Sequence, residues 1–272
     1  MKSKDLLEIS DLTRGEIEHI WSLVDRPIPK LEGRAAWSFE GNGVRTRTSF
    51  IAAFGQLGLE YIELPNLLKT QERVRDLAGY LDPFYLVYVI RESDHQRLTE
   101  FARASTRPVV NAMTGQGHPC EVLSDAYSLR SMFGDLHGVT IGLWGPTTNV
   151  FRSWHQLAAV MGLNVRHFCP AEFHLDLEYV TFCPEPGAPV DVLITDSWPA
   201  DFDDSRWSLS LEVMRTLGNP KLLPTPPFFV GKELAFDPVP SGHFVGYLQK
   251  QQLLEVHRAV LVYLLEGASG ED

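Results

Sequence analysis

Hydrophobic and polar positions follow one another in a pattern that predicts strands alternating with helices along the whole chain. Short apolar runs rich in β-branched and aromatic residues are typical of strands buried on both faces, and apolar positions three and four apart are typical of amphipathic helices. The runs predict strands at 34–39, 61–64, 84–90, 108–110, 139–144, 164–168, 190–195 and 222–223. The helical spacing predicts helices after residues 13, 44 and 93 and at 71–81, 118–133, 150–161, 205–217 and 247–265.

Several helix boundaries carry their own signals. Thr13 with Glu16 three residues later reads as a capping box, and Ser93 is expected to cap the helix that follows it. Gly58 ends the helix that begins near residue 44. The segment 168–191 is acidic and proline-bearing, and its pattern indicates secondary structure only weakly.

Strands alternating with helices imply parallel sheets covered on both faces, with right-handed crossovers. The pattern begins again after a break near residues 134–138, so the fold class is α/β with two doubly wound parallel-sheet domains joined by helices. We expect a first domain at 1–134, a second at 135–246, and a C-terminal helix at 247–272 that packs back onto the first.

Composition and charge narrow the functional classes. The chain is 44% hydrophobic and 22% charged, as is ordinary for a soluble globular protein, and its formal net charge of −11 argues against a nucleic-acid surface. The 3 cysteines have no metal-ligand spacing, which predicts no metal site and a reducing compartment. The start lacks a signal-peptide core and no apolar run is long enough for a membrane, so a cytoplasmic protein is expected.

Candidate chemistry collects where the predicted strands end, which is where open parallel sheets bind ligands. The most suggestive stretch is the glycine-bearing turn at 41–47, where Arg45 and Arg47 open a helix whose amino terminus is suited to anions. The polar residues at successive strand ends are Arg45, Arg47, Arg91, His118, Asn149, Asp196 and Thr225.

Each of these residues also has a structural interpretation. Arg91 could pair with Glu92, His118 could cap the helix that it opens, and Asp196 could be an N-cap. Taken singly, such interpretations are the more common outcome. Taken together, the polar strand ends favour a binding or catalytic site.

The residues resemble the signatures of the aspartate and ornithine carbamoyltransferase family, and the resemblance extends from the first helix to the last. The family's Ser-Thr-Arg-Thr-Arg signature corresponds to Gly-Val-Arg-Thr-Arg at 43–47, and its His-Pro-x-Gln to His-Pro-Cys-Glu at 118–121. Its lone strand-end arginine corresponds to Arg91. The second domain is similar to the ornithine branch at Gly145, at Asn149 and at Thr-Asp-Ser-Trp, 195–198.

The resemblance implies an active site in the cleft between a carbamoyl-phosphate-binding first domain and an acceptor-binding second domain. It implies a homotrimer, with Lys69 of the loop 65–70 as a candidate cation lent to a neighbouring subunit, and no cofactor or covalent intermediate. The implied carbamoyl-phosphate residues are Gly43, Val44, Arg45, Thr46, Lys69, Arg91, His118 and Glu121. Among them Thr46, Arg91, His118 and Glu121 are the implied catalytic residues, and the implied acceptor residues are Asn149, Asp196, Ser197 and Thr225.

The chain departs from the family's pattern mainly on the acceptor side. Gly43 and Val44 replace the signature serine and threonine, and Glu121 replaces the glutamine. The family's Ser-Met-Gly is replaced by Pro-Ala-Asp-Phe at 199–202, its His-Cys-Leu-Pro by Pro-Thr-Pro-Pro at 224–227, and its C-terminal Asn-Arg by Gln252 and Leu253.

Three interpretations follow. The first is a divergent carbamoyltransferase of a specialised pathway that acts on an amine other than ornithine or aspartate. The second is an inactive family member that binds an anion or regulates a partner, and the third is an enzyme that uses the same anion site for another transfer. The persistence of Arg45, Thr46, Arg91 and His118 favours the first.

Overall fold

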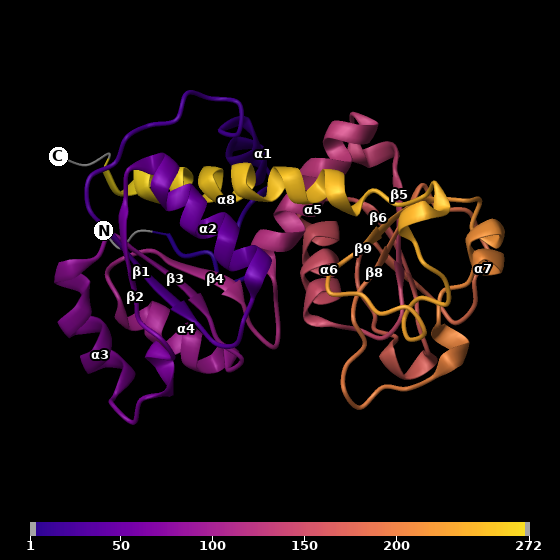
Figure 1. Cartoon of the computed structure of the whole chain (residues 1–272), viewed down its shortest axis with the longest axis horizontal. Helices are drawn as coiled ribbons and strands as arrows, with labels where there is room; N and C mark the ends of the chain where they lie inside the picture. Colours follow the sequence, from indigo (N-terminus) through magenta and orange to yellow (C-terminus); the bar gives the residue numbers. More distant parts are fainter. Residues whose placement is uncertain (1–3, 270–272) are drawn as a thin grey trace. The chain divides into compact units, whose positions relative to one another are not determined.

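The computed structural model describes residues 4–269 (Figure 1). The chain forms two compact units, the first comprising Met1–Tyr127 and Gln251–Asp272 and the second Ser128–Lys250. Both boundaries lie inside helices, namely α5 (Pro119–Phe133) and α8 (Gly246–Ser269). Each unit contains one all-parallel sheet, which confirms the predicted class of two doubly wound α/β domains.

The first unit is built on a four-stranded sheet of order β2-β1-β3-β4. Its strands are β1 (Arg34–Phe39), β2 (Glu60–Glu63), β3 (Val87–Arg91) and β4 (Val109–Met113). Its other helices are α1 (Arg14–Ser22), α2 (Val44–Leu57), α3 (Val74–Leu81) and α4 (His95–Ala104). Because the chain leaves β1 toward β2 and returns on the other side to β3, the order of winding reverses between β1 and β3. Ligands of open parallel sheets bind at such a switch point.

Two helical layers cover this sheet. Figure 1 shows α2 and α8 on one face and α3 and α4 on the other. α2 turns Phe50, Ala53, Phe54 and Leu57 inward, and all four are fully buried. The central strands are buried on both faces, as their continuous apolar runs predict.

The second unit has a five-stranded sheet of order β7-β6-β5-β8-β9. Its strands are β5 (Thr140–Trp144), β6 (Asn164–Phe168), β7 (Val180–Cys183), β8 (Val192–Thr195) and β9 (Lys221–Pro224). Its own helices are α6 (Asn149–Met161) and α7 (Leu211–Thr216). Here the winding reverses between β5 and β8, so the second switch point lies beyond Trp144 and Thr195.

The structure corrects some predicted boundaries. Asp94, rather than Ser93, caps α4 through the backbone N–H of Arg97. β3 begins at Val87, whereas Phe84 lies in a short 3-10 turn and is 60% exposed. The helix predicted at 205–217 is a 3-10 turn followed by the shorter α7, and β7 falls in the weakly patterned segment.

None of the helices within residues 4–269 has the length and apolar character needed to cross a bilayer.

Candidate active site

The turn between β1 and α2 leaves the amino terminus of α2 without a side-chain cap. Gly43 occupies the N-cap position with φ 39° and ψ 40°, a left-handed conformation that favours glycine. The first intrahelical bond joins the Arg47 N–H to the Gly43 carbonyl at 2.8 Å. The backbone N–H groups of Val44, Arg45 and Thr46 therefore precede the helical ladder and carry the positive end of the helix dipole.

Arg91 extends from the end of β3 to this helix terminus. Its Nη1 lies only 2.9 Å from the position that a Cβ on Gly43 would occupy, and its guanidinium lies over the Phe39 ring at 5.8 Å. The side chain is half-buried, yet its guanidinium makes no hydrogen bond or ion pair with any residue that the structure describes. Burial lowers the pKa of Arg91, Glu40 counteracts this, and Arg45 lowers it further by repulsion.

Arg45 and Arg47 differ in their surroundings, although both open the same helix. Arg45 is exposed, and in the described part of the chain its guanidinium has neither a hydrogen bond nor an ion pair. Arg47 forms an ion pair with Glu63 at the end of β2 and lies over the Phe39 ring at 5.7 Å. The ion pair with Glu63 gives Arg47 a structural role. Arg45 and Arg91, in contrast, place two unpaired cations beside the amino terminus of α2.

Lys69 lies in a cluster with two carboxylates of its own unit. Its ammonium forms ion pairs with Glu92, whose side chain is 3% exposed, and with Glu40 at 3.3 Å. Glu40 also accepts the Ser93 N–H at 2.7 Å, and the Asp94 N–H donates to Glu92 at 3.0 Å. The Ser93 backbone and hydroxyl, with Lys69, hold the pKa of Glu40 at about 2, although burial opposes them. The loop 65–70 thus has a role inside its own subunit that the sequence did not indicate.

His118 and Glu121 stand at the start of α5, which follows β4. They are 6% and 4% exposed, and the Val122 N–H donates to the His118 carbonyl at 3.2 Å. The Glu121 carboxylate is close enough to Cys120 that, after burial, it further raises the pKa of that thiol. In the first turn of α5 a carboxylate is favoured by the helix dipole.

The C-terminal helix α8 packs against α2 through His257, which contacts Ser49 and Phe50. Ser49 Oγ lies 2.8 Å from His257 Nδ1 and donates to the Thr46 carbonyl at 3.1 Å, while the His257 ring stacks on Phe50 at 4.0 Å. The Ser49 hydroxyl donates its one proton to the Thr46 carbonyl, so Nδ1 of His257 must be the donor in the bond to Ser49 Oγ. These residues were not predicted as site residues. The sequence feature that could have pointed to this contact is the pair of polar residues His257 and Arg258 within the apolar stretch of α8.

In the second unit the predicted acceptor residues lie at the ends of β5, β8 and β9. Asn149 is the first residue of α6, whose cap is Thr148. The Ser197 N–H donates to the Asp196 side chain at 2.9 Å, and the Ser197 hydroxyl donates to the Pro227 carbonyl. The Thr225 N–H donates to the Thr195 carbonyl at 2.7 Å, which extends the β8–β9 ladder by one bond.

Four buried polar atoms gather at this edge and find no hydrogen-bond partner among the described residues. They are Thr147 Oγ1, Thr195 Oγ1, Trp198 Nε1 and Thr225 Oγ1. The Trp198 nitrogen lies 3.4 Å from the position of a Cβ on Gly145, directly after β5. An unpaired buried polar atom costs about 1–3 kcal/mol. Several at one switch point indicate a site that a polar ligand completes.

A pair of buried histidines supports the loop at Gly145. His167 Nε2 donates to the Gly145 carbonyl at 2.9 Å, which leaves its Nδ1 to accept from His155 Nε2 at 3.1 Å. Burial lowers the pKa of His155 to about 3 and that of His167 to about 4. Both rings are therefore neutral near pH 7, and the chain of donors is fixed in one direction.

Similarity to known proteins agrees with this arrangement. Residues 4–131 match the family described as aspartate/ornithine carbamoyltransferase, carbamoyl-P binding domain. The chain is 27% identical over 311 residues to the ornithine carbamoyltransferase of Methylobacillus flagellatus, covering 98% of this chain and 99% of that protein. The chain belongs to the aspartate/ornithine carbamoyltransferase family.

Other relatives of the family extend the comparison. The ornithine carbamoyltransferase of Thermosynechococcus vestitus is 35% identical over 182 residues, which is 64% of this chain and 58% of that protein. The ornithine carbamoyltransferase structure from Thermus thermophilus aligns with a TM-score of 0.88 at 26% identity, covering 96% and 99% of the two chains. The one from Pyrococcus furiosus aligns with a TM-score of 0.90 at 23% identity, covering 99% and 98%, and supports the fold.

No group of three or more histidine, cysteine or carboxylate side chains within the described residues is placed to hold a metal ion.

Proposed function

We propose that the chain transfers the carbamoyl group of carbamoyl phosphate to the side-chain amine of ornithine or a close analogue. The observation that supports the use of carbamoyl phosphate is a pair of unpaired guanidinium groups, Arg91 and Arg45, beside the uncapped terminus of α2. A half-buried arginine without a partner is costly, and a phosphate at this point would satisfy both arginines and the helix amides.

The roles follow from these positions and from the family's signature. The phosphate binds the amides of residues 44–46 and the Arg45 guanidinium, and Arg91, Thr46 and His118 donate to the carbamoyl oxygen. When the amine attacks the carbamoyl carbon, negative charge develops on that oxygen, and these donors stabilise it. The new C–N bond forms, the bond to the phosphate oxygen breaks, and phosphate leaves with both electrons.

Glu121 has two compatible roles. A carboxylate can accept the hydrogen bond of the carbamoyl NH2, as the family's glutamine does. It can also take up the proton that the attacking amine loses, which glutamine cannot do. The pH–rate profile of Glu121→Gln separates the two roles, because only the second predicts a slower reaction with a shifted profile.

The phosphate side has lost two hydroxyl donors. Gly43 and Val44 stand where the family has serine and threonine, and the Val44 side chain is 65% exposed. A neutral hydrogen bond contributes about 0.5–1.5 kcal/mol, so the two losses weaken phosphate binding by roughly one to two decades. Two arginines and the helix terminus still supply charge-assisted contacts.

The acceptor is the part on which similarity and local sequence disagree. The relatives named above are ornithine carbamoyltransferases, which favours ornithine and gives no support to the expected non-ornithine acceptor. Asn149 and Asp196 suit an amino acid's carboxylate and ammonium. The unpaired Thr195 and Thr225 hydroxyls and the Trp198 N–H supply further donors and acceptors for such a ligand.

A different amine remains the second candidate, on one specific observation. The segment that replaces Ser-Met-Gly folds back as a turn, with the Phe202 N–H donating to Pro199 at 3.1 Å and the Phe202 ring packing on Trp198 at 5.1 Å. Phe202 therefore packs on the core of the second unit, while Ala200 and Asp201 are exposed, and the family's serine and methionine are absent. An amine of another length would suit this edge.

We also propose that the first unit is the carbamoyl-phosphate-binding domain, the second the acceptor-binding domain, and that the chain is a homotrimer. The edge strand β2 leaves Tyr61 43% and Ile62 41% exposed, which supports a subunit contact there. If Lys69 is lent to a neighbour, its pairs with Glu40 and Glu92 must open. A monomer in sedimentation would contradict the trimer.

The deciding experiment is product formation from carbamoyl phosphate with ornithine and with a panel of diamino acids and simple amines. We expect citrulline from ornithine at a rate above that with lysine or aspartate. Turnover with another amine and none with ornithine would establish the second candidate. Phosphate release with no carbamoylated product from any amine would contradict the proposal.

A further inference from the structure

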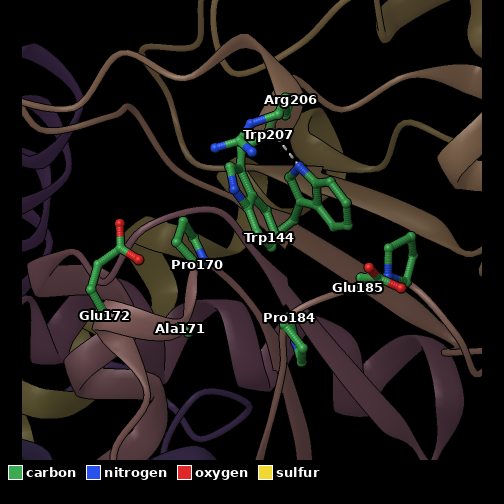
Figure 2. A pocket seen from close by; sticks show the side chains of 9 residues that line it. Trp144, Pro170, Ala171, Glu172, Pro184, Glu185, Arg206 and Trp207 are labelled. Carbon is green, nitrogen blue, oxygen red and sulfur yellow. Dashed lines mark hydrogen bonds between the residues drawn. The ribbon is translucent and has the colours of Figure 1, made fainter.

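The second unit contains a cavity of about 420 Å³ at the carboxyl end of its sheet, to which no role has yet been given (Figure 2). Trp144 at the end of β5 forms one wall, and the segments after β6 and β7 and the loop before α7 form the others. None of the four acceptor residues lines it. Its volume is within the range typical of small-molecule sites.

The apolar wall of the cavity is rigid. The Trp144 indole N–H donates to the Trp207 carbonyl at 2.6 Å, and the two rings lie 5.3 Å apart at 48°. The tryptophans are only 2% and 8% exposed, and the rings of Pro170 and Pro184 continue the lining. Such a surface loses little conformational entropy when a ligand packs on it.

The rim of the cavity is negatively charged. Glu172 and Glu185 line it from opposite sides in the view of Figure 2, and neither forms a hydrogen bond or ion pair with another residue that the structure describes. The segment 168–191, which supplies both, contains 5 carboxylates and no lysine or arginine.

Arg206 also lines the cavity, but its positive charge does not cancel the negative charge of Glu172 and Glu185. Arg206 is held by Asp204 through two parallel bonds, Nε to Oδ1 at 2.9 Å and Nη2 to Oδ2 at 2.6 Å. Asp204 is the main cause that raises the pKa of Arg206, and Glu172 contributes only a weaker attraction. The pair is already neutral in sum, so the two glutamates dominate the field at the rim.

We propose that this cavity binds a small organic cation, namely a primary ammonium group on a hydrocarbon body. The proline rings and the small exposed parts of the two indoles accept the hydrocarbon. Either glutamate can pair with the ammonium, and both repel anions. The inference is independent of the proposed acceptor, because the lining residues and the acceptor residues are separate sets.

The test uses the full chain and three probes of similar size: n-pentylammonium chloride, 1-pentanol and sodium pentanoate. Binding is followed by saturation-transfer NMR and by tryptophan fluorescence in low salt. The pocket variant is Glu172→Gln with Glu185→Gln. The matched control, Asp176→Asn with Glu178→Gln, removes the same charge from exposed positions of the same segment that do not line the cavity.

We expect saturable binding of pentylammonium, none of pentanoate, and weaker binding at higher salt. Each exposed carboxylate contributes roughly two- to fivefold, so the pocket variant binds roughly four- to twenty-five-fold more weakly while the control stays within twofold. The kcat/KM of the pocket variant with carbamoyl phosphate should equal that of wild type. Equal binding of pentanol, an unaffected pocket variant, no saturation by wild type, or a parallel loss of kcat/KM would each overturn the inference.

Discussion

Restoring the family's serine at position 43 should damage this protein rather than improve it. Gly43 has φ 39°, and a left-handed residue with a Cβ costs about 1–2 kcal/mol. The Cβ would also lie 2.6 Å from Phe39 Cε1 and 2.9 Å from Arg91 Nη1. The Phe39 ring is stacked on the buried Trp37 at 4.1 Å and cannot retreat freely. Arg91, at the end of a flexible side chain, is the group that moves.

The magnitudes follow from these contacts. Overpacking adds about 1–3 kcal/mol, so Gly43→Ser should lower the free energy of unfolding by about 2–5 kcal/mol and Tm by roughly 4 °C or more. Displacing Arg91 from the helix terminus removes a charged hydrogen bond and should weaken anion binding roughly ten- to hundredfold.

The assay is thermal unfolding combined with calorimetric titration of inorganic phosphate. Gly55→Ala is the matched control, because Gly55 lies inside the same helix with no atom within 4 Å of its added Cβ. That change should stabilise by about 0.8–1.0 kcal/mol and leave binding unchanged. If Gly43→Ser raises Tm, or binds phosphate more tightly than wild type, the described geometry of the turn is wrong.

Three further predictions concern other parts of the structure. Thr225→Val removes an unpaired buried hydroxyl, so it should raise the free energy of unfolding by about 1 kcal/mol and raise KM for the acceptor; an unchanged KM would exclude Thr225 from that site. The lowered pKa values of His155 and His167 keep the rings neutral in the fold, so stability should fall as the pH drops from about 6.5 toward 4. His155→Leu should flatten that fall in Tm, and an equally steep fall would contradict it. Lys69→Met leaves the buried Glu92 without its cation, so denaturant titration should show a loss of about 1–3 kcal/mol, whereas the exposed control Lys221→Met should show little.

Most elements of the fold could be predicted from local pattern. β1 was predicted at its observed bounds because a buried apolar run ends at a glycine-bearing turn, and α2 because its apolar positions repeat until Gly58. α7 is shorter than predicted because the Leu209 backbone pairs with residues 233 and 235, through bonds of 2.9 Å each. Such pairing across the sequence cannot be inferred from helical spacing.

The same limit applies to the site. Arg91 was predicted from its place at a strand end, but its lack of a partner and its approach to Gly43 depend on how β1 and β3 lie side by side. The sequence predicts Ser93 as the cap of α4, but its hydroxyl bonds to Glu92 and Lys69, and the Asp94 side chain accepts the Arg97 N–H instead. The sequence also could not show that Lys69 meets two carboxylates of its own unit.

The central claim is that carbamoyl phosphate binds where Arg91 and Arg45 meet the amino terminus of α2. The most direct measurement is calorimetric titration of carbamoyl phosphate into wild type, Arg91→Gln and Arg47→Gln. We predict binding by wild type, a roughly ten- to hundredfold loss in Arg91→Gln, and a change within threefold in Arg47→Gln, whose guanidinium is already paired with Glu63. Absence of binding by wild type, or equal losses in the two variants, would contradict the claim.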